Sequence, residues 1–188
     1  MAVNIEELAK ALFDYVGEIS FLKVRDVKSP VYDESGENAG IDLFIPEKTD
    51  ELVEKITANY PAVYVIGNEI HIKAHGDVLI PAGVKSKFGK NIALVANNKS
   101  GIATKKKLAV GAQVIDSGYQ GEIHIHVYNY SDSEQVIEFG QKLVQLLRYV
   151  IGNAPINVVD SMFTSEEEFY NGQKTNRGAG GFGSTGLT

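Results

Sequence analysis

The sequence predicts an all-β fold, a jelly-roll-like β-sandwich or barrel built by a single domain. The chain consists largely of short segments rich in β-branched and aromatic residues, separated by glycine, asparagine and other turn-forming residues. Helical periodicity occurs at only two places. With 188 residues, of which 44% are hydrophobic, the chain is long enough for one core and too short for two comfortable domains.

The two helices are predicted from apolar spacing and capping residues. An amphipathic helix is expected in an N-terminal extension over residues 1–18, where Asn4 fits an N-cap and Gly17 closes the pattern of Ile5, Leu8, Leu12, Tyr15 and Val16. A second helix is expected over Thr49–Asn59, behind a capping threonine. It falls within an expected insertion over residues 47–76.

The strands follow from the β-rich segments between turn signals, and Gly67-Asn68 is expected to form a hairpin turn. The segments, in chain order, are Phe21–Val27, Gly40–Ile45, Ala62–Ile66, Glu69–Ala74, Val78–Ile80, Asn91–Ala96, Lys107–Val110, Gln113–Asp116, Glu122–Tyr130, Gln135–Phe139 and Leu143–Tyr149. So many short strands favour a sandwich, jelly roll or barrel.

Composition narrows the class of function. The net charge of −6 and the pI of about 5.2 argue against a broad footprint for a nucleic acid polymer, so any nucleotide is expected as one molecule in a local pocket. The absence of cysteine excludes disulfides and thiolate sites and fits a reducing cytoplasm. Since no signal sequence or membrane span is evident, we expect a cytoplasmic location, which is the host cytoplasm if a phage encodes the chain.

The C-terminal arm, residues 171–188, ends in a glycine-rich stretch that fits a small anion. Glycines let backbone N–H groups approach a ligand closely, and Ser184 and Thr185 add hydroxyl donors. Arg177 supplies a forked cation suited to phosphate, and Phe182 a flat face suited to a base. Composition alone also allows a disordered, glycine-rich end.

Three upstream segments carry further candidate residues. Ala39-Gly40-Ile41-Asp42-Leu43 places one carboxylate at a strand entry, where an ordinary turn carboxylate is the alternative. Asn98-Lys99-Ser100-Gly101 combines a cation, a hydroxyl and a flexible backbone, as phosphate recognition requires. A hairpin-like stretch over residues 114–123 carries Asp116 near an aromatic ring and two glycines.

Together with Gly140-Gln141-Lys142-Leu143-Val144-Gln145-Leu146-Leu147 and the sequence RGAGGFGSTG at the end, these segments resemble, in order, the five motifs of the homotrimeric dUTPase family. The resemblance runs from about Phe21 to Thr188. It is interrupted by apparent insertions at Glu47–Gly76 and between Gly152 and Asn176.

The resemblance implies a jelly-roll-like trimer whose active sites are each assembled from three subunits, with the arm of one subunit closing a site formed by the other two. It also implies the reaction of dUTP with water to give dUMP and pyrophosphate, with Mg²⁺ bound to the triphosphate.

Individual roles are carried over from the family motifs. Asp116 would act as the base that activates water, which suits a carboxylate. Tyr119 would lie against the deoxyribose and exclude a 2′-hydroxyl. Asp42 would meet Mg²⁺ through a water molecule. Phe182 would stack on uracil when the arm closes.

The remaining substrate contacts that the resemblance implies fall into three groups. Backbone contacts to uracil are expected at Val110, Val114 and Ile115, and contacts to the triphosphate at Lys99, Ser100, Gly101, Gln145 and Arg177. The γ-phosphate would be covered by Gly183, Ser184 and Thr185. The family usually has arginine at the position of Lys99, so the compact ammonium of lysine stands where a planar guanidinium with two parallel donors is usual.

Two other functions and several conspicuous residues stay open. A dCTP deaminase of the same fold would carry its catalytic glutamate at the position of His126, which leaves only Glu122 nearby. A nucleotide-binding regulatory protein acting through a protein partner is the other alternative. His124 and His126 share a strand face that suits either a metal or simple packing, His71 and His75 have less support, and Lys105 to Lys107 read as a solvated charge run.

Overall fold

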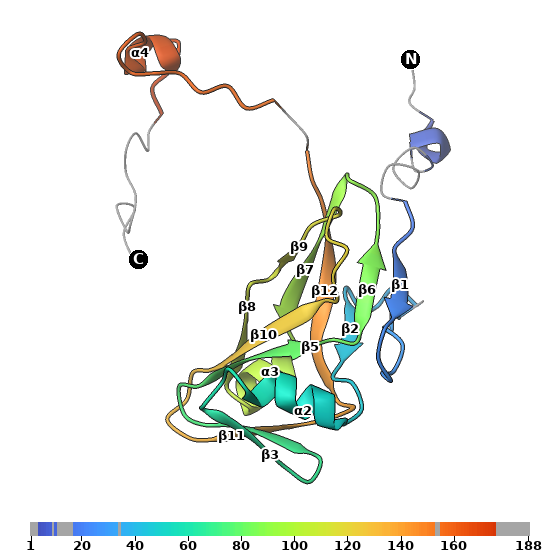
Figure 1. Ribbon diagram of the computed structural model, residues 1–188. Coiled ribbons are helices and arrows are strands. Elements are labelled where there is room, and N and C mark those ends of the chain that lie inside the picture. The colour runs from blue at the N-terminus through green and yellow to red at the C-terminus, as the bar shows by residue number, and fades with distance from the viewer. Residues whose placement is uncertain (1–3, 9, 11–16, 34, 153–154, 176–188) are drawn as a thin grey trace. The chain divides into compact units, whose positions relative to one another are not determined.

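A computed structural model describes residues 4–8, 10, 17–33, 35–152 and 155–175. The chain divides into two compact units, Met1–Gly152 and Asn153–Thr188. The boundary coincides with the start of the second expected insertion. All strands found among the described residues lie in the first unit (Figure 1).

The first unit is built from antiparallel strands, as the sequence predicts. The described strands are β1 (Ser20–Lys23), β2 (Ile41–Phe44), β3 (Val63–Ile66), β4 (Glu69–Ile72), β5 (Asp77–Pro81), β6 (Val84–Lys87), β7 (Ile92–Asn98), β8 (Leu108–Gly111), β9 (Val114–Ile115), β10 (His124–Asn129), β11 (Gln135–Glu138) and β12 (Lys142–Val150). They form four sheets in the orders β1-β6, β5-β10-β8, β11-β4-β3 and β2-β12-β7-β9. The predicted all-β fold is therefore confirmed, and within the described residues no sheet closes into a barrel.

All four sheets contribute apolar side chains to one core. Its fully buried large members include Leu43, Ile70, Ile80, Leu94 and Ile125, which come from β2, β4, β5, β7 and β10. Because burial of such a side chain contributes roughly 1.5–3 kcal/mol, this core is the main source of stability. It fixes the sheet on which the polar candidate residues lie.

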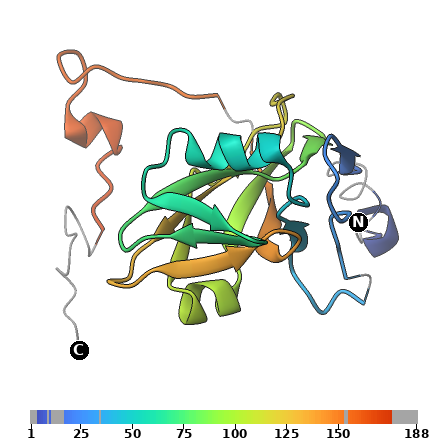
Figure 2. The same cartoon turned by 60° about the horizontal axis from the view of Figure 1, so that its bottom comes forward.

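The segment over residues 47–76 forms part of this core. Its helix, α2 (Asp50–Thr57), begins where the sequence predicts, because the Thr49 hydroxyl accepts a hydrogen bond from the Leu52 N–H at 3.2 Å. Helix α2 contacts β3 and β5, and Figure 2 shows it lying across these strands. The predicted turn at Gly67-Asn68 joins β3 to β4, with Gly67 at a φ of +56°. Strand β4 of this segment pairs with β11, which lies outside the segment, so the segment is an integral part of a sheet.

Several elements differ from the sequence prediction. The N-terminal helix is present at residues 5–8 and 10, where the Asn4 side chain accepts from the Glu6 N–H at 3.0 Å; residues 11–16 of the prediction lie outside the described part. Strand β6 was not predicted, because its sequence Val-Lys-Ser-Lys has low apolar content and gains its order by pairing with β1. Helix α3 (Ser100–Lys105) was not predicted.

In the part of the second unit that the structure describes, residues 155–175 form one short helix, α4 (Glu166–Phe169), which was also not predicted. Ser165 and Glu168 form a capping box, in which the Glu168 N–H donates to the Ser165 hydroxyl at 3.3 Å and the Ser165 N–H donates to the Glu168 carboxylate at 2.9 Å. This reciprocal pair orders a turn that is too short for apolar periodicity to reveal. Over the described residues, no helix has both the length and the apolar character needed to cross a bilayer.

Asn129 is the one fully buried polar residue of the described core. Its amide group donates to the carbonyls of Ile72, Lys73 and Ser133 at 2.8–3.0 Å, and its oxygen accepts from the Ser131 N–H at 3.0 Å. The side chain therefore joins the end of β4 to the loop that follows β10.

Replacing Asn129 by leucine should lower the free energy of unfolding by about 3 kcal/mol, because buried carbonyls lose their donors. Denaturant titration at fixed protein concentration measures the change. Asn68→Ala is the control, since it removes only a 3.3 Å bond to the Phe139 carbonyl, and we expect it to cost less than about 1 kcal/mol. Equal losses in the two variants would contradict this role of Asn129.

Candidate functional site

A small polar cavity of about 230 Å³ lies at the β2 side of the four-stranded sheet. Two of its lining residues lie side by side on neighbouring strands, because Gln145 of β12 pairs with Asp42 of β2. The lining residues are Val31, Asp33, Asn38, Gly40, Asp42, Lys99, Lys142 and Gln145. Three predicted site residues, Asp42, Lys99 and Gln145, therefore meet in one cavity.

Asp42 is the charged centre of this cavity. One carboxylate oxygen pairs with the Lys99 ammonium, and the other accepts from the Lys142 ammonium at 2.8 Å. The Asp42 side chain is only 15% exposed, against 30% for Lys99 and 49% for Lys142. Burial acts to raise the pKa of Asp42, but the hydrogen bonds from Lys142 and Lys99 and their positive charges outweigh it, so the pKa lies below its ordinary value.

Gln145 is held tightly beside Asp42. Its amide nitrogen donates to the Asn98 carbonyl at 3.1 Å. A Cβ at Gly40 would lie 2.8 Å from both the Cβ and the Oε1 of Gln145, so only glycine fits opposite this side chain. Gly40 thus has a packing role at the cavity wall.

Lys142 was missed as a site residue, although the motif that contains it was recognised. In a regular strand, Lys142 and Gln145 would point to opposite faces. The pairing of β12 with β2 shifts register between Lys142 and Val144, and Leu143 and Val144 are both buried. This bulge turns Lys142 toward the cavity that Gln145 also lines, and nothing in the alternation of the sequence indicates it.

Lys99, Ser100 and Gly101 stand at the beginning of α3, with Lys99 at the N-cap position. A flexible backbone was expected here, but Ser100 and Gly101 are helical; both are exposed. The Ser100 carbonyl accepts from the Thr104 hydroxyl at 2.7 Å, and a Cβ at Gly101 would meet only open space. Their accessible position leaves them available to a ligand.

Asp116 lies at the other edge of the same sheet, directly after β9, and is exposed. The turn that follows is fixed by the Tyr119 N–H, which donates to the Asp116 carbonyl at 3.0 Å. The Tyr119 hydroxyl donates to the Glu122 carbonyl at 2.8 Å, and a Cβ at Gly121 would lie about 2.5 Å from the tyrosine ring. Tyr119 therefore has a defined orientation while its side chain stays 43% exposed.

The expected uracil contacts have different surroundings. Val114 and Ile115 form β9, an edge strand of the described sheet, and such an edge presents backbone N–H and C=O groups. Val110 is 8% exposed; its N–H donates to the Asn98 side chain at 2.9 Å and its carbonyl accepts from the Gln113 amide at 3.0 Å. Both polar groups of Val110 thus have partners within the chain.

The structure does not bring the two halves of the predicted site together. Strands β2 and β9 are opposite edges of the four-stranded sheet, three spacings of about 4.8 Å apart, so the backbones of Asp42 and Asp116 are separated by about 14 Å across the sheet. They are also offset along it, because Asp42 lies level with Asn97 through Gln145, whereas Ile115 lies opposite Leu94. One phosphate group therefore cannot contact both Asp116 and the lysine pair of the cavity, Lys99 and Lys142, in the same chain.

The hydrogen bonds of Asp42 decide how its carboxylate could contact Mg²⁺. Both Asp42 oxygens already accept from lysine ammoniums, which leaves no room for a direct metal bond but leaves a second lone pair on each oxygen for a water molecule. Contact with a metal through water therefore fits, and direct coordination does not. Over the described residues no group of three or more histidine or acidic side chains is arranged to hold a metal ion.

His124 and His126, considered above as metal ligands, each lie within hydrogen-bond distance of a neighbouring residue. His126 lies 2.9 Å from a carboxylate oxygen of Asp77, and His124 lies 2.8 Å from the Glu122 carbonyl. Glu122 itself accepts from Arg25 at 2.7 Å and from the Gly83 N–H at 2.9 Å. The metal alternative for His124 and His126 thus finds no support, and Glu122 has a structural role.

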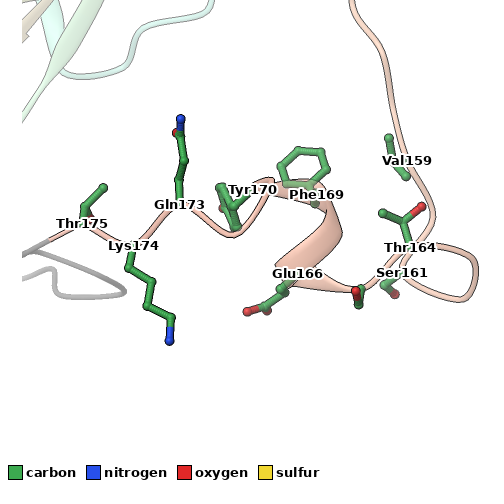
Figure 3. A pocket seen from close by; sticks show the side chains of 10 residues that line it. Val159, Ser161, Thr164, Glu166, Phe169, Tyr170, Gln173, Lys174 and Thr175 are labelled. Atoms are coloured by element: carbon green, nitrogen blue, oxygen red, sulfur yellow. The ribbon is translucent and has the colours of Figure 1, made fainter.

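The remaining predicted site residues, Arg177, Phe182, Gly183, Ser184 and Thr185, lie outside the described residues. A wider depression of about 690 Å³ occurs in the second unit, and Figure 3 shows the side chains that line it. All of them come from residues 159–175, a single stretch of chain around α4. Since it contains none of the predicted site residues, we assign the candidate site to the smaller cavity.

Comparison with known proteins identifies the family. The dUTPase family model matches residues 64–186, which include Asp116 and residues 64–76 of the expected insertion. A deoxyuridine 5'-triphosphate nucleotidohydrolase of Candida glabrata is 33% identical over 134 residues, covering 66% of this chain and 85% of the relative. A probable deoxyuridine 5'-triphosphate nucleotidohydrolase of Schizosaccharomyces pombe is 38% identical over 89 residues, covering 47% of this chain but only 56% of the relative.

Among solved structures, the dUTPase of Staphylococcus bacteriophage 80alpha, solved with dUpNHpp, superposes with a TM-score of 0.67 at 18% identity, covering 90% of this chain and 99% of that one. This likeness confirms the fold. Together with the family model and the C. glabrata relative, it leads to one conclusion: the chain belongs to the dUTPase family.

Proposed function

We propose that the protein hydrolyses dUTP to dUMP and pyrophosphate. The observation that carries the proposal is the cavity in which Asp42, Lys99 and Gln145, predicted from three separate motifs, come together within a chain of the dUTPase family. Relatives named deoxyuridine 5'-triphosphate nucleotidohydrolases support the same substrate.

The chemistry assigned to Asp116 is general-base activation of water. Its carboxylate accepts a proton from the water molecule, whose oxygen forms a bond to the α-phosphorus as the bond from that phosphorus to the bridging oxygen breaks. The electron pair leaves with pyrophosphate. Asp116 suits this role because it is exposed on a turn that two hydrogen bonds hold in shape.

Substrate selection is assigned to the same turn. The edge of β9, with Val114 and Ile115, offers backbone donors and acceptors for the polar edge of uracil. The Tyr119 ring provides a flat apolar surface for the deoxyribose, and a 2′-hydroxyl placed against it would lose its hydration without gaining a partner. Selection for a deoxynucleotide follows.

The triphosphate is assigned to Lys99, Ser100, Gly101 and Gln145, with Arg177 and the Gly183, Ser184 and Thr185 stretch of the arm covering it. Mg²⁺ bound to the triphosphate would neutralise part of its charge and polarise its oxygens. Asp42 would contact that ion only through a water molecule. Phe182 would stack on the base when the arm closes and exclude bulk water.

A homotrimer with shared active sites accounts for the separation of the two halves. If each site takes Asp116 from one subunit and the lysine pair from its neighbour, the distance across the sheet no longer matters. The arm of a third subunit would complete the site. The protein would then bind one nucleotide at each subunit boundary.

Pyrophosphate release from dUTP, dCTP, dTTP and UTP tests the substrate. We expect Mg²⁺-dependent release from dUTP at least about 100-fold faster than from the other three, because a hydrogen-bonding site rejects analogues strongly. Ammonia release from dCTP, assayed in parallel, would favour the deaminase alternative. No pyrophosphate from dUTP would overturn the proposal.

A further inference from the structure

We propose that Lys142 is a polyphosphate-binding residue of this site, held in place by Asp42. The proposal rests on the function proposed above and adds a second cation to the phosphate-binding cavity. It starts from the position of Lys142, which lines the same cavity as Lys99 and Gln145 although it lies three residues from Gln145 on β12.

Both lysines of the cavity keep N–H donors that the chain does not use. An ammonium group has three N–H donors. Asp42 accepts from Lys142 and Lys99, one at each carboxylate oxygen, so each ammonium keeps donors for a ligand. The other carboxylate of the lining, Asp33, accepts from the Ser35 N–H at 3.0 Å and from the Asn38 amide at 2.7 Å. Each carboxylate oxygen thus has a partner within the chain, and the two ammoniums have N–H donors left for an anion.

The placement of Lys142 is specific. The bulge in β12 turns its side chain toward the cavity, and its ammonium lies 5.8 Å from the centre of the buried Phe44 ring, within the range of a cation–π contact. The Lys142 side chain remains half exposed, whereas that of Asp42 is mostly covered. An anion entering from solvent therefore meets the ammonium before it meets the carboxylate.

Lys28 provides a matched control. Its ammonium also contacts the Phe44 ring, at 5.7 Å, and donates to the Gly140 carbonyl at 2.9 Å. Lys28 does not line the cavity. Removal of its charge therefore changes the same neighbourhood without changing the proposed phosphate contact.

The test measures binding of inorganic triphosphate, and of the non-hydrolysable imido analogue of dUTP, by calorimetry in metal-free buffer. Lys142→Met should weaken both by about tenfold or more, since a hydrogen bond to a charged group is lost. Lys142→Arg should stay within about threefold of the unaltered protein, and Lys28→Met within about twofold, because each keeps the cavity charge.

Asp42→Asn separates a direct contact from a structural one. If Lys142 binds phosphate itself, Asp42→Asn keeps both ammoniums and should bind triphosphate more tightly than Lys142→Met does. Equal losses in these two variants would mean that Lys142 serves only as the partner of Asp42, and the proposal would be wrong.

The proposal and the enzymatic function fail in different ways. Affinities of Lys142→Met within twofold of the unaltered protein, or no binding of either probe to the unaltered protein, overturn the role of Lys142 even if dUTP is hydrolysed. A tenfold loss of triphosphate binding in a protein that does not hydrolyse dUTP supports the anion site and overturns only the proposed reaction.

Discussion

Asp116→Asn should reduce the turnover of dUTP by about 1,000-fold, because an amide cannot accept the proton of the attacking water. The substitution preserves the size of the side chain. It also preserves the turn, since the hydrogen bond from the Tyr119 N–H goes to the backbone carbonyl of residue 116 and not to its carboxylate. The dissociation constant of the imido analogue should therefore stay within about threefold of the unaltered value. Single-turnover pyrophosphate release and calorimetry measure the two quantities.

Asp132→Asn is the control for this prediction. The Asp132 side chain is fully solvent-accessible and lies on a turn, where it contacts His75 at 2.9 Å, away from the cavity and from β9. We expect its turnover to match that of the unaltered protein. If Asp116→Asn retained normal turnover, the base would have to be sought elsewhere; if it lost analogue binding to the same extent, Asp116 would be a binding residue.

Much of the fold follows from local signals in the sequence. Thr49 caps α2 and Gly67-Asn68 turns the β3–β4 hairpin, because each needs only a few neighbouring residues to act. Strand β6 and helix α3 escape prediction because their order comes from contacts outside their own sequence. Strand β6 pairs with β1, which is about sixty residues earlier, and α3 packs against β8.

In the candidate site, too, the sequence does not reveal what depends on contacts between distant segments. Asp42, Lys99 and Gln145 were predicted from separate motifs, and sheet pairing brings them together. Lys142 was missed because a bulge in β12 changes which way it points, and alternation along a strand cannot reveal a bulge. The roles of Asp116 and Tyr119, and of the arm residues, remain predictions.

The separation of Asp42 from Asp116 was not foreseeable from sequence either. It depends on the strand order β2-β12-β7-β9, in which segments distant in the chain become neighbours. This order places the lysine pair and the proposed base at opposite edges of one sheet. The proposed function therefore requires a site to which more than one subunit contributes.

Two variants, each inactive by design, should restore activity when they are combined in one trimer. The first is Asp116→Asn, and the second is the double variant Lys99→Met, Gln145→Ala. In a mixed trimer, a site at the boundary between the two kinds of chain takes an intact Asp116 from the double variant and an intact phosphate cavity from the single variant. For random assembly from equal amounts, about a quarter of all sites are intact.

The deciding measurement is pyrophosphate release from dUTP by such hybrids, prepared by co-expression with two different affinity tags and purified through both. Every trimer that carries both tags contains both kinds of chain and has one intact site of three, so sites shared between chains predict about a third of the activity of the unaltered protein per chain. Hybrid trimers that are no more active than the better of the two variants alone would show that each site lies within one chain, and would contradict the account.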